Sequence, residues 1–238
     1  MFAVDENTIW FYDDLVDEME AEWIGGISIK MFKEAMDGFD GKDFTIRIDS
    51  PGGSVRPALS IYNMIQNYPG KVTAIIDSWA ASSLSYIPMA ADEVLIAENG
   101  LIMTHAPWTF AFGNAEDLME VVDALEAHQQ SLAKGYAAKT GKDLETINAE
   151  LLTGENWFTA EQAKDYGLVD GIVEAKVEVK NRVNPKVYGY KQLPDEWRDS
   201  SVQRFAALCP DFPTGGLSSD ELEQLAAVRG RIGELVKE

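Results

Sequence analysis

Short apolar runs alternate with amphipathic stretches along most of this chain, and this alternation limits its fold more than any other feature. The runs are rich in β-branched and aromatic residues, as buried strands are, and lie at 8–12, 44–48, 72–76, 93–97 and 101–104. The repeated strand–turn–helix pattern predicts an α/β fold, in which active sites gather at the ends of strands.

The stretches between these runs predict helices. One helix is expected to begin near Ser28, and another carries Pro57 in its first turn, where proline is tolerated. A helix of small residues is expected over 82–91, despite Pro88 inside it. Asn114 is a good N-cap for a long helix. Together with the strands, these helices predict one domain over residues 1–175.

The long helix carries a narrow apolar stripe. Its members are four or three residues apart in alternation: Leu118, Val122, Leu125, Gln129, Leu132 and Tyr136. Such a stripe suits contact with another helix. Packing against the parent domain is the commoner explanation, and contact with a second subunit is the alternative.

Residues 176–238 have a different character. Four of the nine prolines fall there, and the clear alternation of apolar runs is lost. Residues 218–221 form a capping-box signature, and an apolar face follows it. We therefore expect an irregular C-terminal arm that ends in an amphipathic helix and needs a partner surface.

The formal net charge of −20 lies entirely in the first 175 residues, because residues 176–238 carry ten basic and ten acidic side chains. Such an acidic body repels phosphate backbones, so nucleic-acid binding is not expected. The single cysteine, Cys209, excludes an internal disulfide framework. No signal peptide is visible, and the uncharged stretch 78–91 is too short to span a bilayer. These features predict a soluble, cytoplasmic protein that does not insert into a membrane.

Three short segments at the ends of apolar runs carry groups suited to acyl transfer. The glycines of Ser50-Pro51-Gly52-Gly53 allow backbone N–H groups to point outward as anion donors, although the segment also fits a simple tight turn. Ser82 follows a buried strand and begins a helix, where negative charge is favoured; capping or close packing is the alternative in this serine-rich segment.

His105 ends a strand just before the chain must leave the sheet. The chain has only one other histidine, His128, which lies in the predicted long helix. His105 is therefore the candidate general base, with a purely structural histidine as the alternative. The sequence has no Gly-x-Ser-x-Gly elbow, no His-Glu-x-x-His motif and no Cys/His ligand pattern, so an ordinary α/β-hydrolase and a catalytic zinc site are disfavoured.

An ordered set of motifs connects these segments to a known family. They are Ile48-Asp49-Ser50-Pro51-Gly52-Gly53, Ala80-Ala81-Ser82, Met89-Ala90-Ala91-Asp92, Met103-Thr104-His105-Ala106-Pro107-Trp108 and Trp157-Phe158-Thr159-Ala160-Glu161-Gln162-Ala163 with Tyr166-Gly167-Leu168-Val169-Asp170. From about residue 8 to residue 174 the chain resembles the Clp protease proteolytic subunit family, particularly its phage-encoded branch of head-maturation (prohead) proteases. The resemblance implies the fold that this family shares with the crotonases, with a long handle helix.

The resemblance also implies roles for individual residues. Ser82 matches the nucleophile and His105 the general base, while Gly53 and Ser83 match the backbone donors of the oxyanion hole. The acid of the triad falls on Glu155, where the family has an aspartate one methylene shorter.

The implied substrate site includes Gly52 and Ser78, and Ser78 stands where the family usually has glycine, so its side chain is expected to crowd the cleft. The implied reaction is hydrolysis of extended polypeptides, with or without an ATP-driven unfoldase, and it needs no metal or organic cofactor. Homo-oligomeric, stacked rings are implied, with the helix at 118–136 as the ring-to-ring contact and phage capsid or scaffold proteins as partners.

Three other functions remain open at this point. A catalytically silent assembly protein with the same fold would explain the departures at Glu155 and Ser78. An acyl-CoA enzyme of the crotonase type shares the oxyanion architecture but needs neither Ser82 nor His105. A Ser/Lys peptidase would need a lysine as its base.

Overall fold

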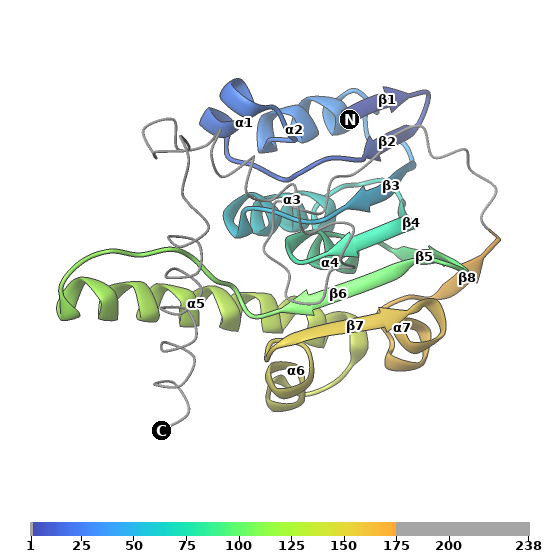
Figure 1. Cartoon of the computed structure of the whole chain (residues 1–238). Helices are drawn as coiled ribbons and strands as arrows, with labels where there is room; N and C mark the ends of the chain where they lie inside the picture. Colours follow the sequence, from blue (N-terminus) through green and yellow to red (C-terminus); the bar gives the residue numbers. More distant parts are fainter. Residues whose placement is uncertain (1, 175–238) are drawn as a thin grey trace, which may run out of the picture. The chain divides into compact units, whose positions relative to one another are not determined.

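The computed structural model describes residues 2–174, which form an α/β domain built on one mixed sheet (Figure 1). Neighbouring strands along the main path are β1 (Phe2–Asp5), β2 (Thr8–Phe11), β3 (Phe44–Ser50), β4 (Val72–Ala81), β5 (Glu93–Ala97) and β8 (Gly171–Val173). Only β1 is antiparallel to its neighbour on this path. The predicted α/β fold and its strands are confirmed.

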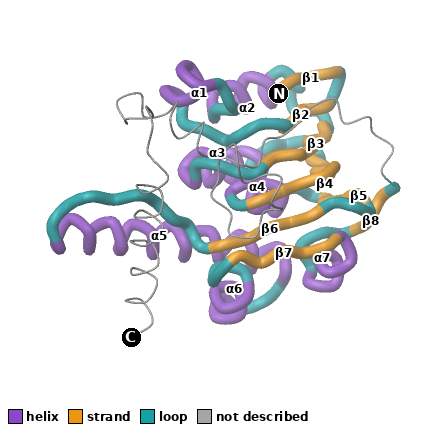
Figure 2. The backbone as a smooth tube through the Cα atoms, in the orientation of Figure 1, coloured by secondary structure: helices purple, strands orange, loops and turns teal. Residues whose placement is uncertain are grey.

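The sheet branches at strand β4, which pairs with β5 in one branch and with β6 in the other (Figure 2, strands in orange). Its first half, Thr73 to Ile76, pairs with β5, and its last residues, Trp79 to Ala81, pair in parallel with β6 (Leu101–His105). Strand β6 also pairs, antiparallel, with β7 (Glu155–Thr159). The branch formed by β6 and β7 therefore places the C-terminal ends of β4 and β6 near the first residue of β7.

The helices of the described residues are α1 (Glu18–Ile24), α2 (Ile29–Asp37), α3 (Val55–Gln66), α4 (Ser83–Tyr86), α5 (Ala115–Thr140), α6 (Leu144–Glu150) and α7 (Ala160–Tyr166). Ser28 caps α2 by accepting a hydrogen bond from Met31 N–H, as its sequence position predicts. Asn114 caps α5 in the same way, through the N–H groups of Glu116 and Asp117.

The single helix predicted over 82–91 is wrong. The α-helical part, α4, is one turn long, and a 3₁₀ turn, η1 (Ile87–Ala90), follows it. Proline lacks an N–H group, and its ring collides with the carbonyl four residues earlier, so Pro88 cannot continue α4. Ser82 itself stands before the helix, with a backbone φ of 53°.

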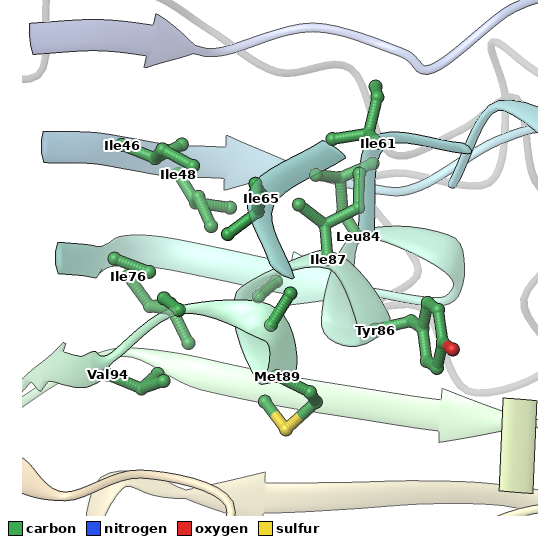
Figure 3. Close-up of a cluster of buried hydrophobic side chains, with 14 of the residues drawn as sticks. Ile46, Ile48, Ile61, Ile65, Ile76, Leu84, Tyr86, Ile87, Met89 and Val94 are labelled. Atoms are coloured by element: carbon green, nitrogen blue, oxygen red, sulfur yellow. The ribbon is translucent and has the colours of Figure 1, made fainter. Parts of the chain in front are cut away.

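The core between the sheet and its helices is mainly branched aliphatic (Figure 3). Ile48 of β3 and Ile76 of β4 face Ile61 and Ile65 of α3, and Leu84 of α4 packs beside them. Fully burying a side chain of this kind contributes roughly 1.5–3 kcal/mol. This packing fixes α4, and with it the turn that carries Ser82, against the end of β4.

Helix α5 packs on its own domain through its second half only. Leu132, Ala133, Gly135 and Tyr136 are buried there, whereas Leu118, Met119 and Val122 are exposed, and the first half extends away from the sheet (Figure 1). The parent-domain explanation of the apolar stripe is thus confirmed for one half of the helix. Within the described residues, no other part of the domain buries Leu118 or Val122.

The predicted arm at 176–238, including Cys209, lies outside the described residues. Across residues 2–174, none of the helices combines the length and the apolar character needed to cross a membrane.

Candidate active site

Ser82 lies at the end of β4 in a strained backbone conformation. Its φ of 53° and ψ of −128° are unusual for a residue with a side chain, and such strain costs about 1–3 kcal/mol. Its N–H donates to the carbonyl of Met103 on β6 at 2.8 Å, and its own carbonyl accepts from Ser85 N–H at 2.9 Å. The side chain of Ser82 makes no capping bond to α4, which removes the capping alternative and leaves its hydroxyl for another task.

That hydroxyl contacts His105. Parallel pairing of β4 with β6 sets Ala81 opposite Met103, so the residues just beyond, Ser82 and His105, reach the same edge of the sheet. Ser82 Oγ lies 2.7 Å from His105 Nε2, the spacing of a hydroxyl hydrogen bond to a ring nitrogen. The structure thus brings together the two residues that the sequence analysis proposed as nucleophile and base. His128 lies on α5, as the sequence predicts.

The pKa of His105 is lowered below its usual value of 6.5, mainly because burial penalises the imidazolium; the charge of Glu155 opposes this effect. A lowered pKa keeps the ring neutral at neutral pH. Only a neutral ring can accept the proton of a serine hydroxyl, so the electrostatics suit a general base.

Glu155 is the first residue of β7, and the antiparallel register places it directly opposite His105 on β6. Its carboxylate is near enough to raise the pKa of the imidazole. The sequence pointed to this position only through a family motif. The register supplies the physical reason why a residue so distant in sequence faces the histidine.

The glycine turn after β3 lies against Ser82. A Cβ atom on Gly52 would sit 2.6 Å from the carbonyl oxygen of Ala81 and 2.7 Å from Cβ of Ser82, and Gly52 has a φ of 107°. Gly53 has a φ of 142°, and a Cβ there would collide with the carbonyl of Leu15. Both positions therefore require glycine, one because of the nucleophile turn and one because of the neighbouring segment.

The N–H groups of Gly53 and Ser83 are available as donors. Gly53 and Leu15 form an isolated β-bridge, but the donors of this bridge belong to residues other than Gly53. Leu15 N–H donates to the carbonyl of Gly52, and Ser54 N–H donates to the carbonyl of Leu15. Ser83 is the first residue of α4, and the first N–H groups of a helix have no partner within it. Within residues 2–174 neither group donates to another backbone carbonyl, as an oxyanion hole requires.

A bulge in β4 connects the glycine turn to the nucleophile strand. The register moves from Ile48↔Ile76 to Ser50↔Ala80, so β4 contains two more residues than β3 in this interval. Asp49 faces the bulge and accepts a hydrogen bond from Trp79 N–H at 3.3 Å. Burial raises the pKa of Asp49 to about 6, against the opposing effects of Trp79 and Ser78.

In the sequence, Asp49 stands only as part of a family motif, with no role of its own. Ser78, predicted to contact substrate, is half-buried on β4, and its hydroxyl interacts with Asp49. Its effect on the substrate cleft stays a prediction. Among the described residues, no group of three or more His, Cys, Asp or Glu side chains is arranged to hold a metal ion.

The sequence profile of the Clp protease family matches residues 3–176. Among curated relatives, the ATP-dependent Clp protease proteolytic subunit 1 of Streptomyces avermitilis is 34% identical over 140 residues, which are 58% of this chain and 64% of the relative. The ATP-dependent Clp protease proteolytic subunit of Ligilactobacillus salivarius is 33% identical over 63% of this chain and 76% of the relative. That of Mesostigma viride is 31% identical over 71% of this chain and 72% of the relative. The profile spans every strand and turn that builds the site, and the chain belongs to the Clp protease family, a family of peptidases.

Proposed function

We propose that this protein is a serine endopeptidase in which Ser82 is the nucleophile, His105 the general base and Glu155 the triad acid. The observation that carries the proposal is the 2.7 Å approach of Ser82 Oγ to His105 Nε2, between the ends of two paired strands. The strained backbone of Ser82 and the lowered pKa of His105 support it, because both are typical of activated nucleophile–base pairs.

The chemistry follows the geometry. Ser82 Oγ attacks the carbonyl carbon of the scissile peptide bond while His105 Nε2 takes its proton. The N–H groups of Gly53 and Ser83 stabilise the oxyanion that forms, and Glu155 stabilises the imidazolium. His105 then gives the proton to the leaving amine. In the second half, His105 removes a proton from water, whose oxygen attacks the acyl carbon. The bond from that carbon to Ser82 Oγ then breaks, His105 returns the proton to Ser82 Oγ, and the acid product leaves.

The proposed substrates are extended polypeptides that lie beside the Gly52 turn. Main-chain pairing with a strand edge gives affinity with little dependence on sequence. Assembly into homo-oligomeric rings also belongs to this proposal, and three relatives are named as proteolytic subunits. A place in phage head maturation, with capsid or scaffold proteins as substrates, rests on the sequence resemblance alone.

Hydrolysis of unfolded casein and of fluorogenic peptides tests the proposal. Wild type should cleave both, and Ser82→Ala should lose at least ~10³-fold of the turnover, since the nucleophile is removed. Ser60→Ala is the matched control, because Ser60 lies on α3 and, within residues 2–174, its hydroxyl bonds to the carbonyl of Arg56 in its own helix. Light scattering on each sample confirms that assembly is unchanged.

The catalytically silent assembly protein predicts a different result. Wild type would then assemble fully and cleave neither substrate, and Ser82→Ala would be indistinguishable from it. That outcome would replace the peptidase proposal with the scaffold.

A further inference from the structure

A chain of hydrogen bonds links helix α5 to the backbone of the nucleophile. Tyr136 of α5 lies with its hydroxyl 2.7 Å from Ser85 Oγ on α4. Ser85 Oγ donates to the carbonyl of Ser82 at 2.6 Å, and Ser85 N–H donates to the same carbonyl at 2.9 Å. All three residues belong to the described domain, and the sequence alone indicates no role for Ser85 or for the Tyr136 hydroxyl.

The direction of these bonds follows from the acceptor at the end of the chain. A carbonyl oxygen can only accept, so the one proton of Ser85 Oγ is committed to Ser82. Tyr136 must therefore donate to Ser85. Burial raises the pKa of Tyr136, so the phenol keeps its proton at neutral pH.

The carbonyl of Ser82 belongs to the same peptide group as the N–H of Ser83. A trans peptide group is planar, and its C=O and N–H point in opposite directions. Holding the carbonyl toward Ser85 therefore turns the Ser83 N–H to the side opposite Ser85. Two donors on the carbonyl also polarise the peptide group and make that N–H a stronger donor.

Tyr136 is held firmly in place. Its ring meets Tyr86 edge-on, with the ring centroids 5.5 Å apart, and Tyr86 stacks on Tyr62 of α3. A Cβ atom on Gly135 would lie 2.3 Å from the ring of Tyr86, so α5 could not approach this closely with any other residue there. Figure 3 shows Tyr86 at the margin of the core. The hydroxyl of Tyr136 thus has a fixed position from which to donate.

We propose that Ser85 and Tyr136 are positioning residues that orient the Ser82–Ser83 peptide group and so aim the Ser83 N–H into the oxyanion hole. The proposal rests on the proposed serine peptidase function. It makes helix α5, whose first half is exposed, part of the structure that sets the geometry of the oxyanion hole. Because an oxyanion forms only during acylation and deacylation, these residues should affect kcat and leave KM unchanged.

The test compares Tyr136→Phe, Ser85→Ala and the double variant with wild type. The readouts are the rate of labelling by a fluorophosphonate, kcat and KM on a fluorogenic peptide, and the melting temperature. Each single variant should label about tenfold more slowly and lose kcat to a similar degree, as expected for one lost hydrogen bond, with KM within about twofold of wild type. Tyr62→Phe is the matched control, because it removes a neighbouring tyrosine hydroxyl outside this chain of bonds.

The double variant separates positioning from simple support of the fold. Ser85→Ala leaves the buried Tyr136 hydroxyl without its acceptor and lowers stability, and adding Tyr136→Phe removes that hydroxyl. The melting temperature should therefore recover in the double variant while labelling stays slow. Labelling that recovers together with stability, or single variants that match Tyr62→Phe, would overturn the proposal. Failure of wild type itself to label would instead overturn the peptidase function on which it rests.

Discussion

At the level of single residues, His105 is subject to two opposing effects. Burial lowers its pKa, and the charge of Glu155 across the β6–β7 pair raises it. The general base must be neutral, so kcat/KM should rise with pH through the pKa of His105. For wild type the midpoint of this rise is expected below 6.5, the usual histidine value.

Glu155→Gln should move that midpoint to a still lower pH, because it removes the negative charge that stabilises the imidazolium. It should also reduce kcat by about 10²–10⁴-fold, since the imidazolium formed during catalysis loses the same stabilisation. Glu161→Gln is the matched control, because Glu161 lies on α7, just beyond the end of β7 opposite Glu155, and accepts a hydrogen bond from the Thr159 hydroxyl. A pH–rate profile of both variants checks this. An unchanged kcat and midpoint in Glu155→Gln would show that another acid orients His105.

The sequence identifies the reacting residues better than their geometry. Ser82 and His105 stand out because each follows an apolar run within a family motif. The positive φ of Ser82 could not be predicted, because it depends on hydrogen bonds to Met103 and Ser85 that form only in the folded chain. Ser85 likewise gives no local signal, since the sequence cannot show which carbonyl its hydroxyl will reach.

At the level of elements, β4 is the clearest example of tertiary contacts overriding a local pattern. The sequence predicts a strand over 72–76, but β4 continues to Ala81. Asp77 interrupts the apolar run, so the sequence pattern predicts that the strand ends at Ile76. In the fold, Asp77 is buried and satisfied by a bidentate ion pair with Arg47 and a hydrogen bond from Tyr12 at 2.6 Å. Partners so distant in sequence could not be inferred locally.

Helix α5 shows the reverse case, in which the sequence pattern extends beyond what its own domain covers. The stripe continues to Leu118 and Val122, which remain exposed. An exposed apolar stripe of this kind costs free energy in water and favours self-association. The predicted subunit contact through the first half of α5 therefore remains consistent with the fold.

Val122→Asp should weaken self-association, because it places a charge on the exposed stripe. The expected result is a smaller assembly at micromolar concentration, measured by size-exclusion chromatography with light scattering, with an unchanged far-ultraviolet circular dichroism spectrum. Ala124→Asp adds the same charge on another face of the same helix and should leave the assembly intact. A wild type that is monomeric, or two variants that behave alike, would contradict the subunit contact.

At the level of the whole molecule, the sheet brings four distant segments of the chain to one edge. Gly53 follows β3, Ser82 follows β4, His105 ends β6 and Glu155 begins β7. Three of them lie at the ends of strands in a repeating α/β pattern, which is why the sequence predicts their convergence. The position of Glu155 depends on β7 returning antiparallel after α5 and α6, and no periodicity in the sequence indicates that return.

Mapping the adduct of a fluorophosphonate by peptide mass spectrometry tests the central claim most directly, because the reagent reacts with an activated serine and marks it covalently. We predict a single adduct on Ser82 in wild type and Glu155→Gln, slower in the latter, and none in His105→Ala. Adduct on Ser83 or Ser85, or labelling of His105→Ala at the wild-type rate, would contradict the proposed nucleophile–base pair.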